Sequence, residues 1–104
     1  MYYLYILYSK SSDRYYIGYT NDPKRRLEEH NTSPFRTYTS KHRPWILEAA
    51  FAISKNRGET MRVERYLKKL KSRRVIEQLI KDQDSAKNIS QSLMEMSNQA
   101  LKNK

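Results

Sequence analysis

Apolar and polar positions predict three strands in the first half of this chain. Residues 2–8 are aromatic or aliphatic throughout, residues 9–13 are polar, and residues 14–20 again carry aromatic and aliphatic side chains. Tyr and Ile suit strands and a polar stretch marks a turn, so this pattern predicts a two-stranded hairpin. A third strand is predicted over residues 45–53, where three alanines leave space for a helix to pack.

Strand side chains alternate between the two faces of a sheet, which separates aliphatic from aromatic positions in the hairpin. Leu4 takes one face of the first strand and Tyr5 the other. In the second strand, Tyr16 and Gly18 share one face and Ile17 takes the other. Tyr5 and Tyr16 can therefore both point away from the aliphatic face. Gly18 inside a strand predicts close approach by another backbone or by a ligand.

The first helix has a clear predicted start. Residues 21–22, an Asn-Asp pair, offer two candidate caps, and Pro23 suits the first helical position. We expect this helix to end near Asn31. Arg26 and His30 are four residues apart on it and therefore share one face.

The remaining pattern completes the predicted fold. Residues 32–44 are predicted as a loop, residues 59–70 as a helix, and residues 75–80 as part of a further short helix. The sequence thus predicts an α/β domain, a three-stranded antiparallel sheet flanked by helices in the order ββαβαα.

Composition changes at residue 82, where Ser, Asn, Gln and Lys become frequent, so we predict a domain over 1–81 and a polar tail over 82–104. An amphipathic stripe in the tail is formed by Ile89, Leu93, Met96 and Ala100. The tail could be a helix docked on the domain or on a partner, or it could be disordered. Protein binding or self-association through residues 85–101 is therefore one prediction.

The net charge of +10 belongs to the predicted domain. Residues 1–81 hold 18 Lys or Arg against 8 Asp or Glu, whereas residues 82–104 hold three of each. A basic domain attracts polyanions, of which nucleic acid is the commonest, although charge alone leaves an ordinary soluble surface possible. The chain has no cysteine, which excludes disulfides and suits a cytoplasmic protein. The apolar stretch at the start is too short to span a membrane.

Basic side chains cluster at three predicted positions. The loop carries Arg36, Lys41 and Arg43 beside aromatic residues, a combination that suits phosphate contact and base stacking but also occurs in ordinary solvated loops. The other candidates for nucleic-acid contact are Arg25, Arg26 and Lys68.

The run from Tyr16-Ile17-Gly18 through Pro23 and Arg26 to His30 places a strand, a cap and a basic helix face in one stretch. With Tyr5 upstream and Glu64 downstream, this order resembles the GIY-YIG nuclease superfamily over roughly residues 1–80. The first family motif is replaced here by Tyr3-Leu4-Tyr5, without its glycine and isoleucine.

The resemblance implies a catalytic set of Tyr5, Tyr16, Arg26, His30 and Glu64. It implies that Arg26 contacts the scissile phosphate and that a tyrosine accepts the proton of the attacking water or orients it. We favour Tyr16 as the base and Tyr5 as its positioning partner, with the reverse left open, and His30 as a phosphate ligand or proton carrier.

Glu64 is implied as the ligand of one Mg²⁺ or Mn²⁺, since a hard cation can be held by one carboxylate, waters and substrate oxygens. On composition alone it would be the partner of Lys68 in an i,i+4 ion pair. We expect a metal-dependent endonuclease that acts on DNA (RNA is not excluded), structure-selective or weakly sequence-selective, in repair or recombination. The alternatives are a nucleic-acid-binding module that does not cut, or a subunit that needs a partner protein.

Overall fold

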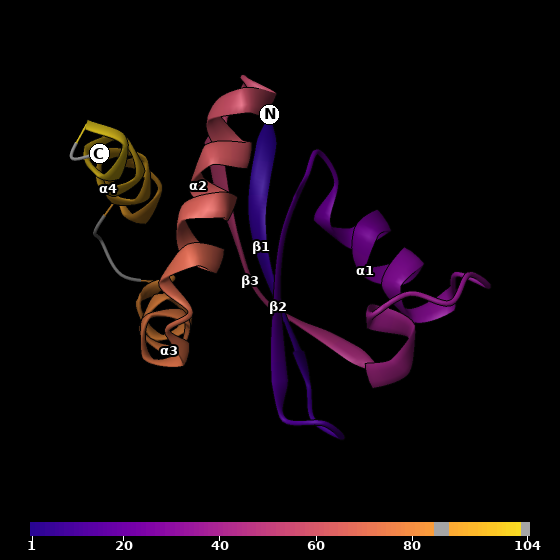
Figure 1. The fold of residues 1–104 in the computed structure, drawn as a ribbon. Coiled ribbons are helices and arrows are strands. Elements are labelled where there is room, and N and C mark those ends of the chain that lie inside the picture. The colour runs from indigo at the N-terminus through magenta and orange to yellow at the C-terminus, as the bar shows by residue number, and fades with distance from the viewer. Residues whose placement is uncertain (85–87, 103–104) are drawn as a thin grey trace.

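The computed structural model describes residues 1–84 and 88–102 (Figure 1). Strands β1 (Tyr2–Ser9), β2 (Arg14–Thr20) and β3 (Trp45–Ser54) form one antiparallel sheet in the order β2-β1-β3. Helices flank the sheet on both faces, so the predicted fold class is confirmed. Each expected strand is present, and the first and third extend one residue further than predicted.

The register of the sheet sorts the side chains as alternation predicts. Tyr5 lies opposite Gly18 and Leu7 lies opposite Tyr16. The aliphatic face, which includes Leu4, packs against α2 (Arg57–Leu70) in the larger core. A smaller core on the other face contains Tyr5, Leu7 and Trp45. The tyrosine-bearing face is therefore also covered.

Helix α1 (Pro23–Thr32) covers part of that second face (Figure 1). Asp22 is the cap, because its side chain accepts a hydrogen bond from the amide of Arg25. In the predicted loop after α1 lies a 3₁₀-helix, η1 (Thr39–His42), which buries Thr39. The loop is thus partly ordered against α1 and the sheet.

Helix α2 begins two residues earlier than predicted because Asn56 caps it, accepting from the amide of Glu59. Val63 and Leu67 are buried on the sheet side. The helix ends at Leu70, and Lys71 takes a left-handed conformation before α3 (Arg73–Asp82) begins.

Helix α4 (Ile89–Lys102) packs on the domain, one of the alternatives predicted for the tail. Leu93 and Ser97 are 1% and 2% exposed, whereas Met96 of the predicted stripe is 40% exposed. A helix buries whichever face meets its neighbour, and here that face includes Ser97, whose hydroxyl donates to the carbonyl of Met94. Residues 85–87 of the predicted interaction segment lie outside the described residues, and the proposed domain boundary at residue 82 stays a prediction.

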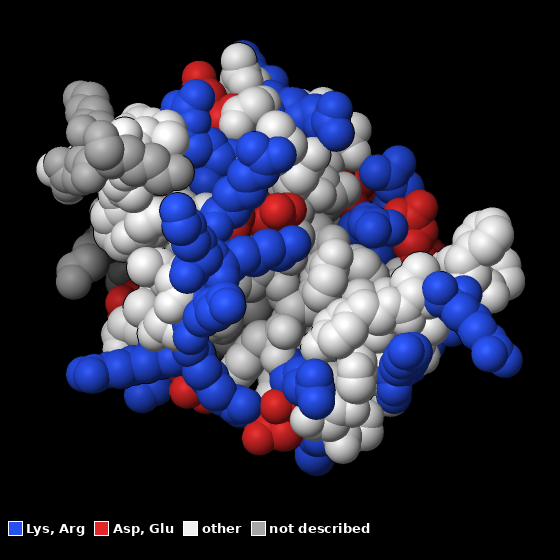
Figure 2. Space-filling view, in the orientation of Figure 1, with Lys and Arg blue, Asp and Glu red and all other residues white. Residues whose placement is uncertain are grey.

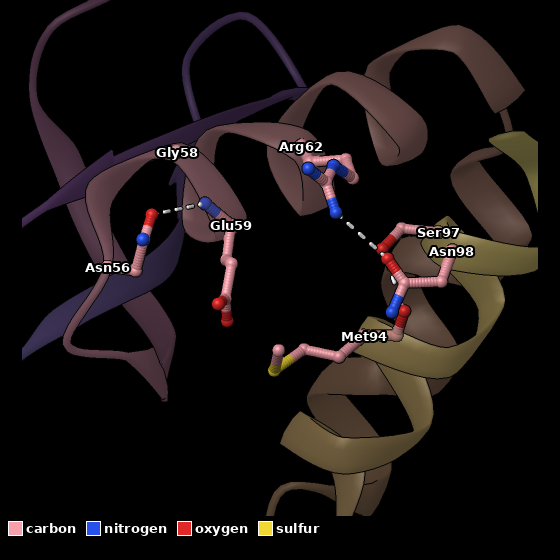
Figure 3. Close-up of a pocket in the computed structure, with 7 residues that line it drawn as sticks. All are labelled: Asn56, Gly58, Glu59, Arg62, Met94, Ser97 and Asn98. Carbon is pink, nitrogen blue, oxygen red and sulfur yellow. Dashed lines mark hydrogen bonds between the residues drawn. The ribbon is translucent and has the colours of Figure 1, made fainter.

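A hollow of about 330 Å³ lies where α4 meets the start of α2 (Figure 3). Arg62 donates to the side-chain oxygen of Asn98 across it, and Glu59 points toward it from the first turn of α2. None of the candidate catalytic residues lines this hollow. The hydrogen bond between Arg62 and Asn98 joins the two helices, and the hollow is not the candidate site. Among residues 1–84 and 88–102, no helix has the length and apolarity needed to cross a membrane.

Candidate active site

The hairpin brings Tyr5 and Tyr16 together on the face covered by α1. Their ring centroids are 6.3 Å apart. Gly18 lies under the Tyr5 ring, and a Cβ at this position would overlap the Oη and Cζ atoms of Tyr5. The close approach predicted at Gly18 is therefore made by a side chain of the neighbouring strand, and the glycine makes room for the Tyr5 hydroxyl.

His30 is buried, with 4% exposure, and both ring nitrogens are hydrogen-bonded. Its Nε2 lies 2.9 Å from the Tyr5 hydroxyl and its Nδ1 lies 2.9 Å from the Thr39 hydroxyl. Burial, together with the nearby Arg26 guanidinium, lowers the pKa of His30 to about 4. His30 is thus neutral near pH 7, so this geometry supports an orienting role and does not support a cationic phosphate ligand.

The structure adds Thr39 and Trp45 to the candidate site. The carbonyl of Thr39 accepts a hydrogen bond of 2.7 Å from Trp45 Nε1, and the Trp45 ring meets Tyr16 edge-on at 6.0 Å. Sequence reasoning missed both residues, because their role depends on how the loop folds back over His30. Burial raises the pKa of Tyr5, and the neighbouring Tyr16 raises it further. Tyr5 is therefore a hydrogen-bonded, protonated group inside the domain.

The accessible part of the site is a hollow of about 150 Å³. Its lining includes Tyr16, Arg26 and Tyr38, with His30 at its wall. Tyr16 is partly exposed, and Arg26 forms a partly exposed ion pair of 3.3 Å with Glu29. A ligand in this hollow would lie beside Tyr16 and Arg26 at once.

Glu64 approaches the same tyrosine from α2. Its carboxylate lies 3.4 Å from Lys68 Nζ, and that ammonium lies 5.5 Å from the centroid of the Tyr16 ring. The i,i+4 pair considered from the sequence is therefore present. The Glu64 side chain is 14% exposed, so it is sheltered but open to solvent.

The carboxylate of Glu64 fits the weak, open metal site expected of it. Within residues 1–84 and 88–102, no group of three or more His, Cys, Asp or Glu side chains could enclose a metal ion. A hard divalent cation held by one carboxylate keeps its other positions for water and phosphate oxygens. Such a cation would replace Lys68 as the partner of Glu64.

Basic side chains surround this region. Figure 2 shows Lys and Arg side chains in a band over α2 and α3, beside a hollow in the surface. Of the predicted contacts, Arg36 and Lys41 are exposed, and Arg25 is exposed while donating to the side chain of Asn21.

Arg43 makes hydrogen bonds that the sequence did not predict. Its guanidinium donates to the carbonyls of His30 and Ser33, both at 2.6 Å. These groups belong to the carboxyl end of α1, where carbonyls lack helical partners. Arg43 thus ties the loop to α1, and its contact with nucleic acid stays a prediction.

Residues 1–87 match the family model of the GIY-YIG catalytic domain. Two curated bacterial relatives cover most of the chain. The UPF0213 protein BH0048 of Halalkalibacterium halodurans is 40% identical over 78 residues, which are 75% of this chain and 80% of the relative. The UPF0213 protein YazA of Bacillus subtilis is 38% identical over 68 residues, 65% of this chain and 67% of the relative.

A third relative matches over a shorter stretch. The structure-specific endonuclease subunit SLX1 of Meyerozyma guilliermondii is 47% identical over 51 residues, which are 44% of this chain but 17% of that protein. Among solved structures, the solution NMR structure of the UPF0213 protein BH0048 from Bacillus halodurans is 36% identical. It has a TM-score of 0.48 and covers 85% of this chain and 92% of that one.

Proposed function

Because the chain belongs to the GIY-YIG family, we propose that it is a divalent-metal-dependent endonuclease that hydrolyses phosphodiester bonds of DNA. The family domain is a nuclease catalytic domain, which confirms the prediction of an enzyme. The finer parts of the proposal are the metal, DNA as the substrate, a role in repair or recombination, and the cytoplasm as its location.

The observation that carries the proposal is that three elements converge on Tyr16. Its own strand, β2, places Tyr16 with Arg26 of α1 in the lining of one hollow. Helix α2 brings Lys68 over the Tyr16 ring and Glu64 beside Lys68. These residues would thus supply a proton acceptor, a phosphate ligand and a metal ligand around one small space.

Hydrolysis of a phosphodiester needs an attacking water, stabilisation of phosphoryl charge and alignment of the reacting groups. Arg26 would hold two phosphate oxygens with its planar guanidinium. Tyr16 would orient the water or accept its proton. Of the two tyrosines, Tyr16 suits this role, because Tyr5 is buried, is held by His30 and has a raised pKa.

A divalent cation held by Glu64 would neutralise charge on the phosphate and on the departing 3′ oxygen. Glu64 would hold the cation with a carboxylate that lies beside Lys68 in the structure. Lys68, whose ammonium lies over the Tyr16 ring, would contact a phosphate oxygen. The buried hydrogen bond between Tyr5 and His30 would keep the floor of the site fixed.

Selectivity for DNA structure is supported by the relative whose name describes a structure-specific endonuclease subunit. Branched and flapped DNA arises in repair and recombination, hence the proposed pathway. The word "subunit" in that name also favours a partner protein as a second candidate role. On this chain, the exposed apolar residues Met96 and Leu101 of α4 are available for such a contact.

The proposal is tested by cleavage of end-labelled single-stranded, duplex, flap and four-way-junction DNA with Mg²⁺, Mn²⁺ or EDTA. The wild type is compared with Glu64→Ala and with Glu95→Gln, a control that removes an exposed carboxylate on α4. We expect metal-dependent cleavage by the wild type and the control and none by Glu64→Ala, which should still bind. Strong binding without cleavage by every protein would instead favour the non-cutting or partner-dependent alternatives.

A further inference from the structure

A second hollow lies on the other side of Tyr38 from the candidate active site. It measures about 300 Å³ and is bounded by β2, the end of α2 and the start of α3. Tyr38 lines both hollows. Lys68 lines the second hollow while its ammonium lies over the Tyr16 ring. A molecule in this space would therefore adjoin a phosphate held at Tyr16 and Arg26.

The lining of this hollow combines three kinds of surface. Cationic side chains come from Arg14, Lys68, Lys71 and Arg73. Aromatic rings come from Tyr15 and Tyr38, and an apolar floor comes from Ile17, Leu67 and Ile76. The single acid, Asp13, is neutralised by Arg73 at 2.6 Å.

This chemistry fits one nucleotide better than a duplex. Aromatic and apolar surface stacks with a base of any sequence, and cations track the phosphates on either side. About 300 Å³ is at the low end of small-molecule pockets, which is too small for a base pair with its two backbones. Tyr38 is 48% exposed, and Arg14 donates to its hydroxyl at 3.4 Å, which holds the ring at the rim.

Lys71 provides an independent observation. Its φ of 50° and ψ of 39° are left-handed, a conformation that glycine adopts at helix ends without the strain that a side chain brings. Within residues 1–84 and 88–102, the exposed ammonium of Lys71 pairs with no carboxylate. Lys71 thus presents an exposed cation beside the hollow, in a conformation that glycine would adopt with less strain.

We propose that this hollow receives one unpaired nucleotide next to the scissile phosphate. The preferred substrate is then DNA with a single-stranded segment at the cleavage point, such as a flap. The inference rests on the proposed nuclease function in one respect, because the phosphate beside the hollow is scissile only if the protein cuts DNA. The evidence for the binding site is the hollow itself, and binding to it is measured without cleavage.

Binding is measured in EDTA with fluorescent flap and fully paired duplex DNA of the same length, with 2-aminopurine as the first unpaired base of the flap. Three variants are compared with the wild type: Tyr38→Ala, Tyr38→Phe and Lys71→Gly. Lys55→Ala is the matched control, since Lys55 is an exposed lysine of the segment between β3 and α2. Circular dichroism and thermal unfolding establish that each variant folds.

We expect Tyr38→Ala to weaken flap binding about tenfold, the usual scale for one stacked base, with at most a twofold effect on duplex binding. Tyr38→Phe should keep both the affinity and the quenching of 2-aminopurine. Lys71→Gly should raise the melting temperature and still weaken flap binding severalfold, an opposition that general destabilisation cannot produce. Lys55→Ala should affect both DNAs equally and slightly.

The inference is overturned if Tyr38→Ala and Lys71→Gly weaken flap and duplex binding by the same factor. It is also overturned if neither variant weakens the binding of either DNA. Failure of the proposed function gives a different result. In that case the wild type binds flaps selectively and quenches 2-aminopurine, but cuts no DNA when Mg²⁺ or Mn²⁺ is added.

Discussion

Replacing Gly18 with alanine tests how the two strands position the candidate site. The three atoms that would lie nearest to a Cβ at this position are Oη, Cζ and Cε1 of the Tyr5 side chain. Tyr5 is 1% exposed and hydrogen-bonded to the equally buried His30. The ring therefore cannot swing away into solvent, and Gly18→Ala must shift either the strand pairing or the Tyr5–His30 contact.

The expected effect is the sum of opposing contributions. Alanine in a strand interior is favoured over glycine by roughly 0.5–1 kcal/mol through chain entropy. Overpacking a buried position costs about 1–3 kcal/mol. Leaving a buried donor or acceptor without its partner adds about 1–3 kcal/mol if the bond to His30 breaks. We therefore expect Gly18→Ala to lower the free energy of unfolding by about 2 kcal/mol.

Urea unfolding followed by circular dichroism measures this change, with Gly58→Ala as the matched control. Gly58 is exposed in the first turn of α2, and a Cβ there would meet only Asn56 Oδ1, at 3.1 Å. Gly18→Ala should lower the free energy of unfolding much less in a Tyr5→Leu background, because that substitution removes all three obstructing atoms. The reasoning is refuted if Gly18→Ala is as stable as the wild type, or if its cost is the same in both backgrounds.

Three further predictions follow from the site. Tyr16→Phe should lower the cleavage rate by about 10²–10⁴, the usual contribution of a general base, and Tyr5→Phe should lower it less while reducing stability; single-turnover rates and urea unfolding give both values. Between pH 6.5 and about 4 the unfolded chain binds a proton at His30 that the folded chain does not, so the free energy of unfolding should decrease as the pH is lowered through this window. His30→Gln should remove that part of the pH dependence when unfolding is measured from pH 4 to 7. Arg43→Ala should lower the free energy of unfolding by about 1–3 kcal/mol through two lost helix-end hydrogen bonds, and equal stability together with weakened DNA binding, seen by fluorescence anisotropy, would contradict the structural role of this arginine.

The strands and the start of α1 could be predicted because local rules decide them. Alternation placed Tyr5 and Tyr16 on one face, and Pro23 after a capping side chain placed the helix that carries Arg26. His30 was predicted on that helix, but its burial was not. Its surroundings come from Thr39, nine residues later, and local periodicity carries no information about how an intervening loop folds back.

The same limit applies to the basic loop and the tail. The sequence predicts Arg43 only as one of several cations of the basic loop. Its hydrogen-bond partners are carbonyls of His30 and Ser33, which come within reach only when α1 has folded. In α4, apolar spacing predicts Met96 on the buried stripe, yet Ser97 is the buried residue. Its face meets the domain, and its hydroxyl can be buried without loss because it donates to Met94 within the helix. Partners of buried polar groups depend on tertiary contacts, and these were the parts that the sequence left open.

The most direct test of the central claim is the single-turnover cleavage rate of the best DNA substrate, measured with saturating protein and increasing Mg²⁺ for the wild type and Glu64→Gln. The substitution keeps the shape of the side chain and removes the charge that a metal needs. We predict metal-dependent cleavage by the wild type and loss of cleavage by Glu64→Gln, with DNA affinity unchanged or higher because a negative charge has gone. Equal cleavage rates for the two proteins would contradict the assignment of Glu64 and the metal-dependent mechanism built around Tyr16 and Arg26.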